Sequence, residues 1–159
     1  MALKISAKSP DFSGKLQDES VISLTDFKGK WLVLYFYPKD NTPGCTVEAC
    51  DFSDNMERIT STGAVVIGIS PDSAKSHTNF IAKHNLEFNL IADTEKTIAI
   101  AYDVWGDKTL FGKAYKGIIR TTYIINPDGI IAEVFENVKV HGHVDQVINR
   151  LHKLIESYK

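Results

Sequence analysis

Two cysteines, Cys45 and Cys50, are the residues of this sequence best suited to covalent chemistry, and they are its only cysteines. A cysteine attacks as its thiolate, which is stabilised by the free N–H groups and the positive dipole end at the start of a helix. Cys45 stands where a loop after a predicted buried strand passes into a predicted helix. Ligands of open α/β sheets bind at this place, beyond the carboxyl ends of the strands. We therefore predict that Cys45 is a nucleophile, held ionised and reachable.

The spacing of the two cysteines predicts a conformational change. Five residues of helix advance about 7.5 Å and turn by about 140°, so the two thiols would point apart. A disulfide needs Cα atoms closer than about 7 Å with facing Cβ vectors. Cys45 and Cys50 could therefore bond only if the first helical turns unwound. A disulfide that encloses so few residues would add little stability, which argues against a purely structural role.

Other interpretations of the cysteines are open. Free cysteine is among the most buried residue types, and spacing alone leaves two buried apolar cysteines as plausible as a reactive pair. A zinc site is disfavoured because there are only two cysteines and no histidine follows at a typical ligand interval. His141 and His143 lack a third ligand at recognisable spacing, so we expect them to be solvated or to start a helix. No metal or cofactor is predicted.

The elements around Cys45 predict a parallel strand–helix–strand unit. Residues 31–37 form an apolar, aromatic-rich run of strand length that ends at Pro38. From Cys45, apolar residues recur at helical spacing until Gly63 closes the segment. Residues 64–69 then read as a second buried strand, and such a crossover joins parallel strands.

The second half of the chain predicts a mixed sheet with flanking helices. Together with the parallel unit, this order is compatible with a thioredoxin-like α/β fold. The predicted elements are a helix capped at 72 or 73 that ends near 85, a short strand over 86–91, strands over 118–125 and 130–135 joined by an Asn-Pro-Asp-Gly turn, and a final helix with an apolar stripe over 144–155.

Length and composition predict one globular domain over residues 1–159. Hydrophobic residues make up 43% of the chain and charged residues 24%, which is ordinary for such a domain. The net charge of -2 offers no broad basic surface, so we expect no nucleic-acid partner. The longest apolar run, 31–37, is too short for a membrane span, and we expect a cytoplasmic protein. In that reducing compartment, paired cysteines are more often catalytic or metal-binding than structural.

The residues before Cys45 resemble the active-site signature of the peroxiredoxins, Pro-x-x-x-Thr-x-x-Cys, which Pro38, Thr42 and Cys45 match. Cys50 stands where the subgroup named for bacterioferritin comigratory protein has a second cysteine. Asp103 replaces a frequent glycine of that subgroup and Tyr123 a frequent phenylalanine, but every expected reacting group is present. The similarity extends to residues 9–12, 68–72, 102–105 and 117–123.

The resemblance implies a thioredoxin-dependent thiol peroxidase that reduces hydrogen peroxide and organic hydroperoxides in antioxidant defence. It implies that Cys45 is the peroxidatic cysteine and that Cys50 resolves it as an intramolecular disulfide. It assigns Pro38, Thr42 and Arg120 to the shell around the peroxide. Thioredoxin or a similar dithiol protein would recycle the enzyme, and the subgroup favours a monomer.

Physical roles follow for the neighbouring side chains. Arg120 falls in a predicted strand, where a buried charge needs a partner such as a thiolate or the departing oxygen; the alternative is an edge-strand arginine that reaches solvent. The hydroxyl of Thr42 could donate to peroxide or only form a turn. Pro38 could exclude water, or simply terminate the strand. Glu48, expected in the first helical turn, could orient Arg120, although the helix dipole favours an acidic residue there anyway.

Two competing functions use the same thiols. A general thiol–disulfide oxidoreductase would exchange disulfides with unrelated proteins and react slowly with peroxide, and it usually has a Cys-x-x-Cys motif, which this chain lacks. A redox-sensing binding module would become oxidised without sustained turnover.

Overall fold

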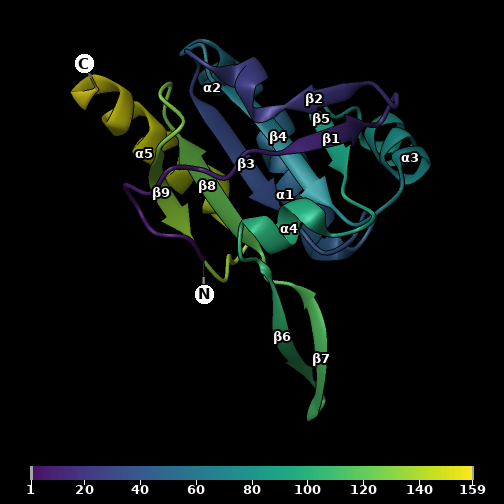
Figure 1. Cartoon of the computed structure of the whole chain (residues 1–159). Coiled ribbons are helices and arrows are strands. Elements are labelled where there is room, and N and C mark those ends of the chain that lie inside the picture. The colour runs from purple at the N-terminus through teal and green to yellow at the C-terminus, as the bar shows by residue number, and fades with distance from the viewer. Residues whose placement is uncertain (1, 159) are drawn as a thin grey trace.

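A seven-stranded mixed sheet forms the centre of the protein (Figure 1). The structure is a computed structural model, and it describes residues 2–158. The strand order is β2-β1-β5-β4-β3-β8-β9, in which β3, β4 and β5 are parallel and the outer strands pair antiparallel. No helix within the described residues is long and apolar enough to cross a membrane. The elements are β1 (Ser13–Leu16), β2 (Val21–Ser23), the 3-10 helix η1 (Leu24–Phe27), β3 (Leu32–Phe36), α1 (Pro43–Asp54), α2 (Met56–Thr60), β4 (Val65–Ser70), α3 (Ala74–His84), β5 (Asn89–Ala92), α4 (Thr97–Ala101), β6 (Trp105–Leu110), β7 (Lys113–Ile118), β8 (Thr121–Ile125), β9 (Ile131–Phe135) and α5 (His143–Ser157).

The central strand β3 is buried on both faces, which explains its continuous apolar sequence. Val33 and Tyr35 belong to the core cluster that includes apolar side chains of α1, α3 and α5. Leu34 and Phe36 belong to the cluster on the other face, which includes α4 and the N-terminal segment. The sheet therefore lies between two apolar layers, and the predicted mixed sheet with flanking helices is confirmed.

Most predicted elements occur close to their expected positions. The crossover β3–α1–β4 joins parallel strands, and β8 and β9 form the expected antiparallel hairpin. The side chain of Ser73 caps α3 by accepting a hydrogen bond from the N–H of Ser76 at 3.1 Å. Asn85 ends that helix in the left-handed conformation, with φ of 52°. These elements are specified by local signals that sequence reasoning reads well.

The predicted single helical segment up to Gly63 is wrong in detail. The chain forms α1 and α2, separated at Asn55, whose φ of -110° and ψ of 12° are not helical. The side-chain amide of Asn55 donates to the carbonyl of Asp51 at 2.8 Å. This local hydrogen bond competes with regular helix and accounts for the break.

The predicted strand over 118–125 is confirmed over residues 121–125 but wrong before them, because Arg120 lies outside any strand. β7 ends at Ile118 and β8 begins at Thr121. Between them the N–H of Ile119 donates to the carbonyl of Val104 at 2.7 Å, and the carbonyl of Arg120 accepts from Val138 at 3.0 Å. These contacts to other segments break the strand at Arg120.

Sequence reasoning missed the ribbon formed by β6 and β7, which projects away from the sheet at the bottom of Figure 1. We call residues 105–118 the β6–β7 arm. Phe111 and Gly112 make its turn, with φ of 51° and 78°. Asparagine or aspartate normally precedes glycine in a turn of this kind, so Phe111 hid the hairpin signal.

Candidate active site

Cys45 lies in the first turn of α1, where the helix presents free N–H groups. Pro43 is the first helical residue, a position that suits its fixed φ and missing N–H. The N–H of Thr46 donates to the carbonyl of Thr42 at 2.9 Å, so the N–H groups of Gly44 and Cys45 precede the helical hydrogen-bond ladder. Helical side chains tilt toward the N-terminus, which brings the Cys45 sulfur to the positive end of the dipole.

Arg120 joins Cys45 to a buried acid. Its Nη2 donates to Sγ of Cys45 at 3.3 Å, and its Nη1 donates to Oε1 of Glu48 at 2.7 Å. A Cβ at position 44 would lie 3.3 Å from Arg120 Nη2, so Gly44 leaves room for the guanidinium group. Burial lowers the pKa of Arg120, but Glu48 and Cys45 outweigh it and raise the pKa overall. The guanidinium fork thus contacts two potential anions at once.

Glu48 is fully buried, and the positive charge of Arg120 offsets only part of the effect of burial on its pKa. Burial raises its pKa to about 7, with the charge and hydrogen bond of Arg120 acting in the opposite direction. Among the described residues, Oε2 has no hydrogen-bond partner. α1 begins at Pro43, so Glu48 lies in the second turn, and the prediction of the first turn is wrong.

His143 lies behind Glu48; the expected helix start is confirmed, but the alternative of a solvated side chain is wrong. It starts α5 but is buried, with Nε2 3.9 Å from Oε2 of Glu48 and 2.8 Å from Oγ1 of Thr122. Burial and the positive charge of Arg120 lower the pKa of His143 to about 4. The imidazole is therefore neutral near pH 7. His141, by contrast, is exposed.

The prediction that the Cys45 sulfur is reachable is wrong for this state, because Cys45 is buried. Cys45 is 1% exposed, whereas the side chain of Arg120 is 17% exposed. Reactive cysteines are usually partly exposed and close to positive charge. Cys45 has a positive charge beside it, that of Arg120. The side chain of Arg120 extends from the buried sulfur to the surface, where it is partly exposed.

Thr42 and Pro38 belong to the loop that leads into α1. The hydroxyl of Thr42 donates to the carbonyl of Lys39 at 2.9 Å, so it stabilises the turn in this state. Its oxygen can still accept a hydrogen bond, but donation to a peroxide requires the hydroxyl to rotate. Pro38 follows β3 and is half-buried.

A polar network that sequence reasoning missed anchors this loop. The N–H of Asp40 donates to Oδ2 of Asp72 at 2.8 Å. The Asp40 carboxylate accepts from the Tyr37 hydroxyl at 2.6 Å and Ser76 Oγ at 2.7 Å, and contacts His77 Nδ1 at 2.8 Å. Burial raises the pKa of Asp40, but these contacts, with His77 the largest, lower it overall. The sequence offered one signal for this network: His77 lies three residues before Phe80, on the same face of the predicted helix, so its side chain should be buried and need polar partners.

The group of Asp40, Asp72 and His77 has the composition of a metal site, since one ligand atom of each lies within 4.8 Å of the others. His77 Nε2 contacts the carbonyl of Ile91 at 2.9 Å, and Asp72 Oδ2 accepts from Ser70 Oγ at 2.6 Å. Because the protein's own groups already occupy these atoms, the cluster acts as an anchor for the loop.

Cys50 lies on α1 as well, half-buried, and both cysteines are free. Burial and the negative charges of Asp54 and Asp51 raise the pKa of Cys50. Cys50 is therefore a thiol rather than a thiolate near neutral pH. The two cysteines share one continuous helix, in which their side chains point apart.

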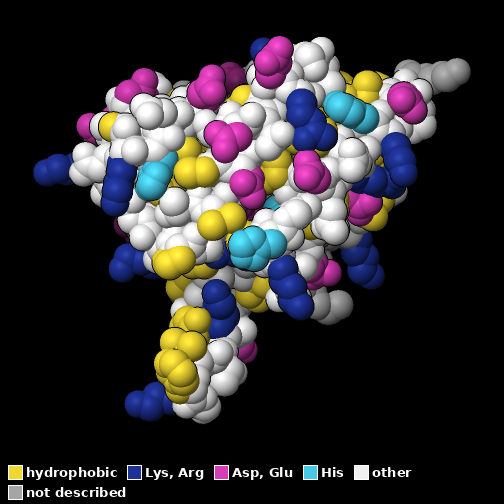
Figure 2. All heavy atoms as spheres, turned by 180° about the vertical axis from the view of Figure 1, so that it is seen from behind, with side chains coloured by type: hydrophobic (Ala, Val, Ile, Leu, Met, Phe, Trp, Pro, Cys, Tyr) yellow, Lys and Arg dark blue, Asp and Glu magenta, His cyan; other side chains and the backbone are white. Residues whose placement is uncertain are grey.

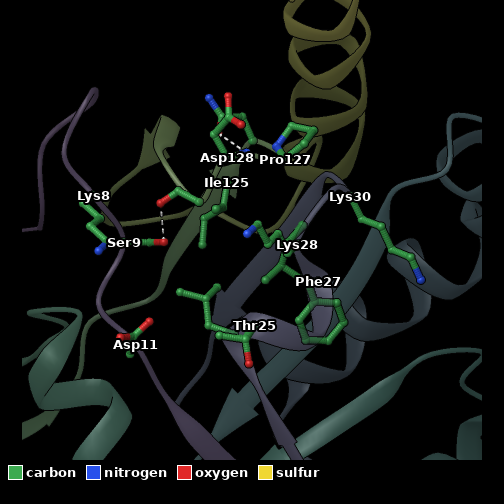
Figure 3. A pocket seen from close by; sticks show the side chains of 14 residues that line it. Lys8, Ser9, Asp11, Thr25, Phe27, Lys28, Lys30, Ile125, Pro127 and Asp128 are labelled. Atoms are coloured by element: carbon green, nitrogen blue, oxygen red, sulfur yellow. Dashed lines mark hydrogen bonds between the residues drawn. The ribbon is translucent and has the colours of Figure 1, made fainter.

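A cavity of about 340 Å³ lies at the opposite end of β3 and contains none of the predicted site residues (Figure 3). Leu32, which begins β3, and Ile125, which ends β8, line it. Ser9, also in its wall, donates from Oγ to the carbonyl of Gly129 at 2.6 Å (Figure 3). The reactive group with a charged partner is at the Cys45 end, so we place the candidate site there.

Comparisons with known proteins identify the family of the chain. A model of the AhpC/TSA family matches residues 5–134. The chain is 48% identical to a putative peroxiredoxin bcp of Coxiella burnetii over 95% of this chain and 100% of that protein, and 46% identical to peroxiredoxin Bcp of Bacillus subtilis over 98% and 99%. A solved structure of the bacterioferritin comigratory protein of Xanthomonas campestris, described for its alkyl peroxide reduction activity, has a TM-score of 0.89 at 38% identity and covers 98% of this chain and 99% of its own. The chain therefore belongs to the AhpC/TSA family, and it is a thioredoxin-fold thiol peroxidase of the peroxiredoxin Bcp type.

Proposed function

We propose that Cys45 is the nucleophile of this peroxidase and that its sulfur accepts one oxygen atom of the substrate. Its thiolate attacks one oxygen of a hydroperoxide, an S–O bond forms, and the O–O bond breaks. The sulfur becomes a sulfenic acid, while the other oxygen leaves with the electron pair and takes a proton to give an alcohol or water. The substrates are hydrogen peroxide and organic hydroperoxides.

Arg120 is proposed to stabilise the thiolate before the attack and the leaving oxygen during it. The 3.3 Å contact with Sγ supports the first role, and the fixed positive charge of a guanidinium group supports the second. Glu48 is proposed as a positioning residue, because it holds the other guanidinium nitrogen at 2.7 Å. Thr42 and Pro38 are proposed to shape the peroxide pocket.

Cys50 is proposed to resolve the sulfenic acid. Its thiol condenses with the Cys45 sulfenic acid, which releases water and forms a disulfide after the first turns of α1 unwind. A dithiol protein, thioredoxin or one similar, then attacks this disulfide and leaves as the oxidised partner. A cytoplasmic location belongs to the same proposal, since the cycle needs a reducing compartment.

The observation that carries the proposal is the guanidinium–sulfur contact at the N-terminus of α1. The test is peroxide consumption coupled to thioredoxin, thioredoxin reductase and NADPH, with the parent protein, Cys45→Ser and Cys50→Ser. We expect no peroxide reduction by Cys45→Ser. Cys50→Ser should react once and recycle poorly; unchanged recycling would remove Cys50 from the mechanism.

Peroxide consumption and insulin reduction, measured separately on the parent protein, distinguish the competing functions. A general thiol–disulfide oxidoreductase would reduce insulin disulfides faster than peroxide. A redox sensor would consume one equivalent of peroxide and then stop, even with thioredoxin present.

A further inference from the structure

The β6–β7 arm carries an apolar surface that the core does not use. Phe111 at its tip is 95% exposed, and Leu110 and Tyr115 are 56% and 43% exposed. Figure 2 shows hydrophobic side chains running along the arm, with basic side chains at its base and tip. Contiguous exposed apolar surface of this kind usually marks an interaction site.

The two faces of the arm differ in charge. Lys108 pairs opposite Tyr115, and Leu110 opposite Lys113, so these four side chains share one face. This face contains two lysines, two large apolar residues and no acid. On the other face Lys116 is neutralised by Asp107 at 2.9 Å. We call the first the Lys108 face.

The Lys108 face leads toward the active site. Nζ of Lys108 donates to the carbonyl of Ile118 at 2.8 Å, at the base of the arm and two residues before Arg120. A Cβ at Gly117 would lie 3.0 Å from Cδ of Lys108, so the glycine makes room for the lysine to run along the ribbon. Burial and the charge of Arg120 lower the pKa of Lys108, and Cys45 opposes them, which agrees with this placement.

Size restricts what can approach the sulfur. Each strand of the arm has six residues, which corresponds to about 20 Å. A dithiol protein of about 100 residues has a radius of gyration of about 13 Å. Such a protein cannot bring its cysteine to the base of the arm without lying beside the arm. Redox encounters bury little surface, so this short ribbon is large enough to guide one.

We propose that the Lys108 face, with Phe111 at its tip, docks the dithiol protein that reduces the Cys45–Cys50 disulfide. This inference rests on the proposed function. The apolar residues and lysines of this face would complement a reductant that has an apolar surface around its reactive cysteine and acidic residues at the rim of that surface.

The test compares a protein reductant with a small one. The double variant Leu110→Thr/Tyr115→Thr keeps strand-forming residues but removes the apolar contacts. With thioredoxin as reductant we expect its KM to rise about tenfold, which corresponds to about 1.4 kcal/mol. With dithiothreitol as reductant, and in the oxidation of Cys45 by peroxide, the variant should match the parent. Lys113→Glu should also raise the KM for thioredoxin, and added salt should reduce its difference from the parent.

A control is Val21→Thr, which removes another exposed apolar side chain, from β2 at an edge of the central sheet. It should leave both assays unchanged. An unchanged KM for thioredoxin in the double variant would overturn the docking surface alone. A parent protein recycled by dithiothreitol but not by thioredoxin would overturn both the reductant and its docking site. A parent protein that fails to reduce peroxide with either reductant would instead refute the proposed function.

Discussion

At the scale of single residues, the site depends on the shape of one side chain. Arg120 contacts Cys45 with one guanidinium nitrogen and Glu48 with another. A lysine has the same charge but a single nitrogen, so it cannot keep both contacts in this geometry. The arrangement therefore requires a fork as well as a positive charge.

Arg120→Lys tests this requirement. We expect kcat/KM for hydrogen peroxide to fall about 10²-fold or more, as when one donor to a developing negative charge is removed. Stopped-flow oxidation of Cys45 measures it, with circular dichroism to verify the fold. A lysine variant as fast as the parent would mean that positive charge alone is sufficient.

The raised pKa of Glu48 should make the free energy of unfolding depend on pH. Its pKa is raised from 4.5 to about 7, chiefly by burial, so the folded chain keeps a proton there that the unfolded chain releases in this range. Its stabilising contribution is complete below pH 4.5 and is lost as the pH rises through about 7. Glu48→Gln should therefore gain stability relative to the parent over this window, by up to about 3 kcal/mol. Urea unfolding of both proteins across the window measures it, and parallel pH curves would contradict it.

His143 supplies the control for this experiment. Its pKa is lowered from 6.5 to about 4 by burial and by Arg120, so its contribution to stability rises with pH between these values. In the parent protein this gain in stability from His143 opposes the loss of stability from Glu48 as the pH rises. His143→Gln should therefore make the decline of stability with pH steeper.

At the scale of elements, the cycle depends on α1 opening between its two cysteines. Val47 lies between them and is half-buried. Val47→Gly and Val47→Ala both remove the valine methyl groups, but glycine makes the helix less stable than alanine by about 0.5–1 kcal/mol. We expect the glycine variant to form the disulfide about two to five times faster than the alanine variant. Quenched-flow alkylation after one equivalent of peroxide measures both, and equal rates would mean that unwinding does not limit resolution.

The elements that sequence reasoning predicted well are those specified by local signals. The aromatic run of β3, the Ser73 cap of α3 and the turn before β9 each depend on neighbouring residues. The strand predicted around Arg120 failed in part because residues 118–125 are rich in strand-forming residues, and only contacts to Val104 and Val138 interrupt the strand. Such contacts between distant segments leave no periodic pattern in the sequence.

The residues of the candidate site also divide into those that a local sequence pattern predicts and those that it does not. Pro38, Thr42 and Cys45 match one short motif, and Cys50 stands where the subgroup has its second cysteine. In the structure Arg120 contacts both Cys45 and Glu48. The network around Asp40 was not predictable, because His77 and Asp72 belong to another part of the chain and have no motif that links them to the loop.

At the scale of the whole molecule, the β6–β7 arm is separate from the core. Its strands pair with each other and with no strand of the central sheet. Replacing residues 109–114 by Asn-Gly should keep a short hairpin, since this pair favours the required turn. We expect the unfolding free energy to change by less than about 1 kcal/mol. Urea unfolding measures it; a larger loss would mean that the arm supports the fold.

Peroxide reduction by this protein requires the sulfur of Cys45 to accept an oxygen atom. The most direct measurement treats Cys50→Ser with one equivalent of hydrogen peroxide, traps sulfenic acid with dimedone and maps the adduct by mass spectrometry. We expect one adduct per chain, at Cys45, and none in Cys45→Ser. Absence of the adduct, or peroxide consumption by Cys45→Ser at the rate of the parent, would contradict it.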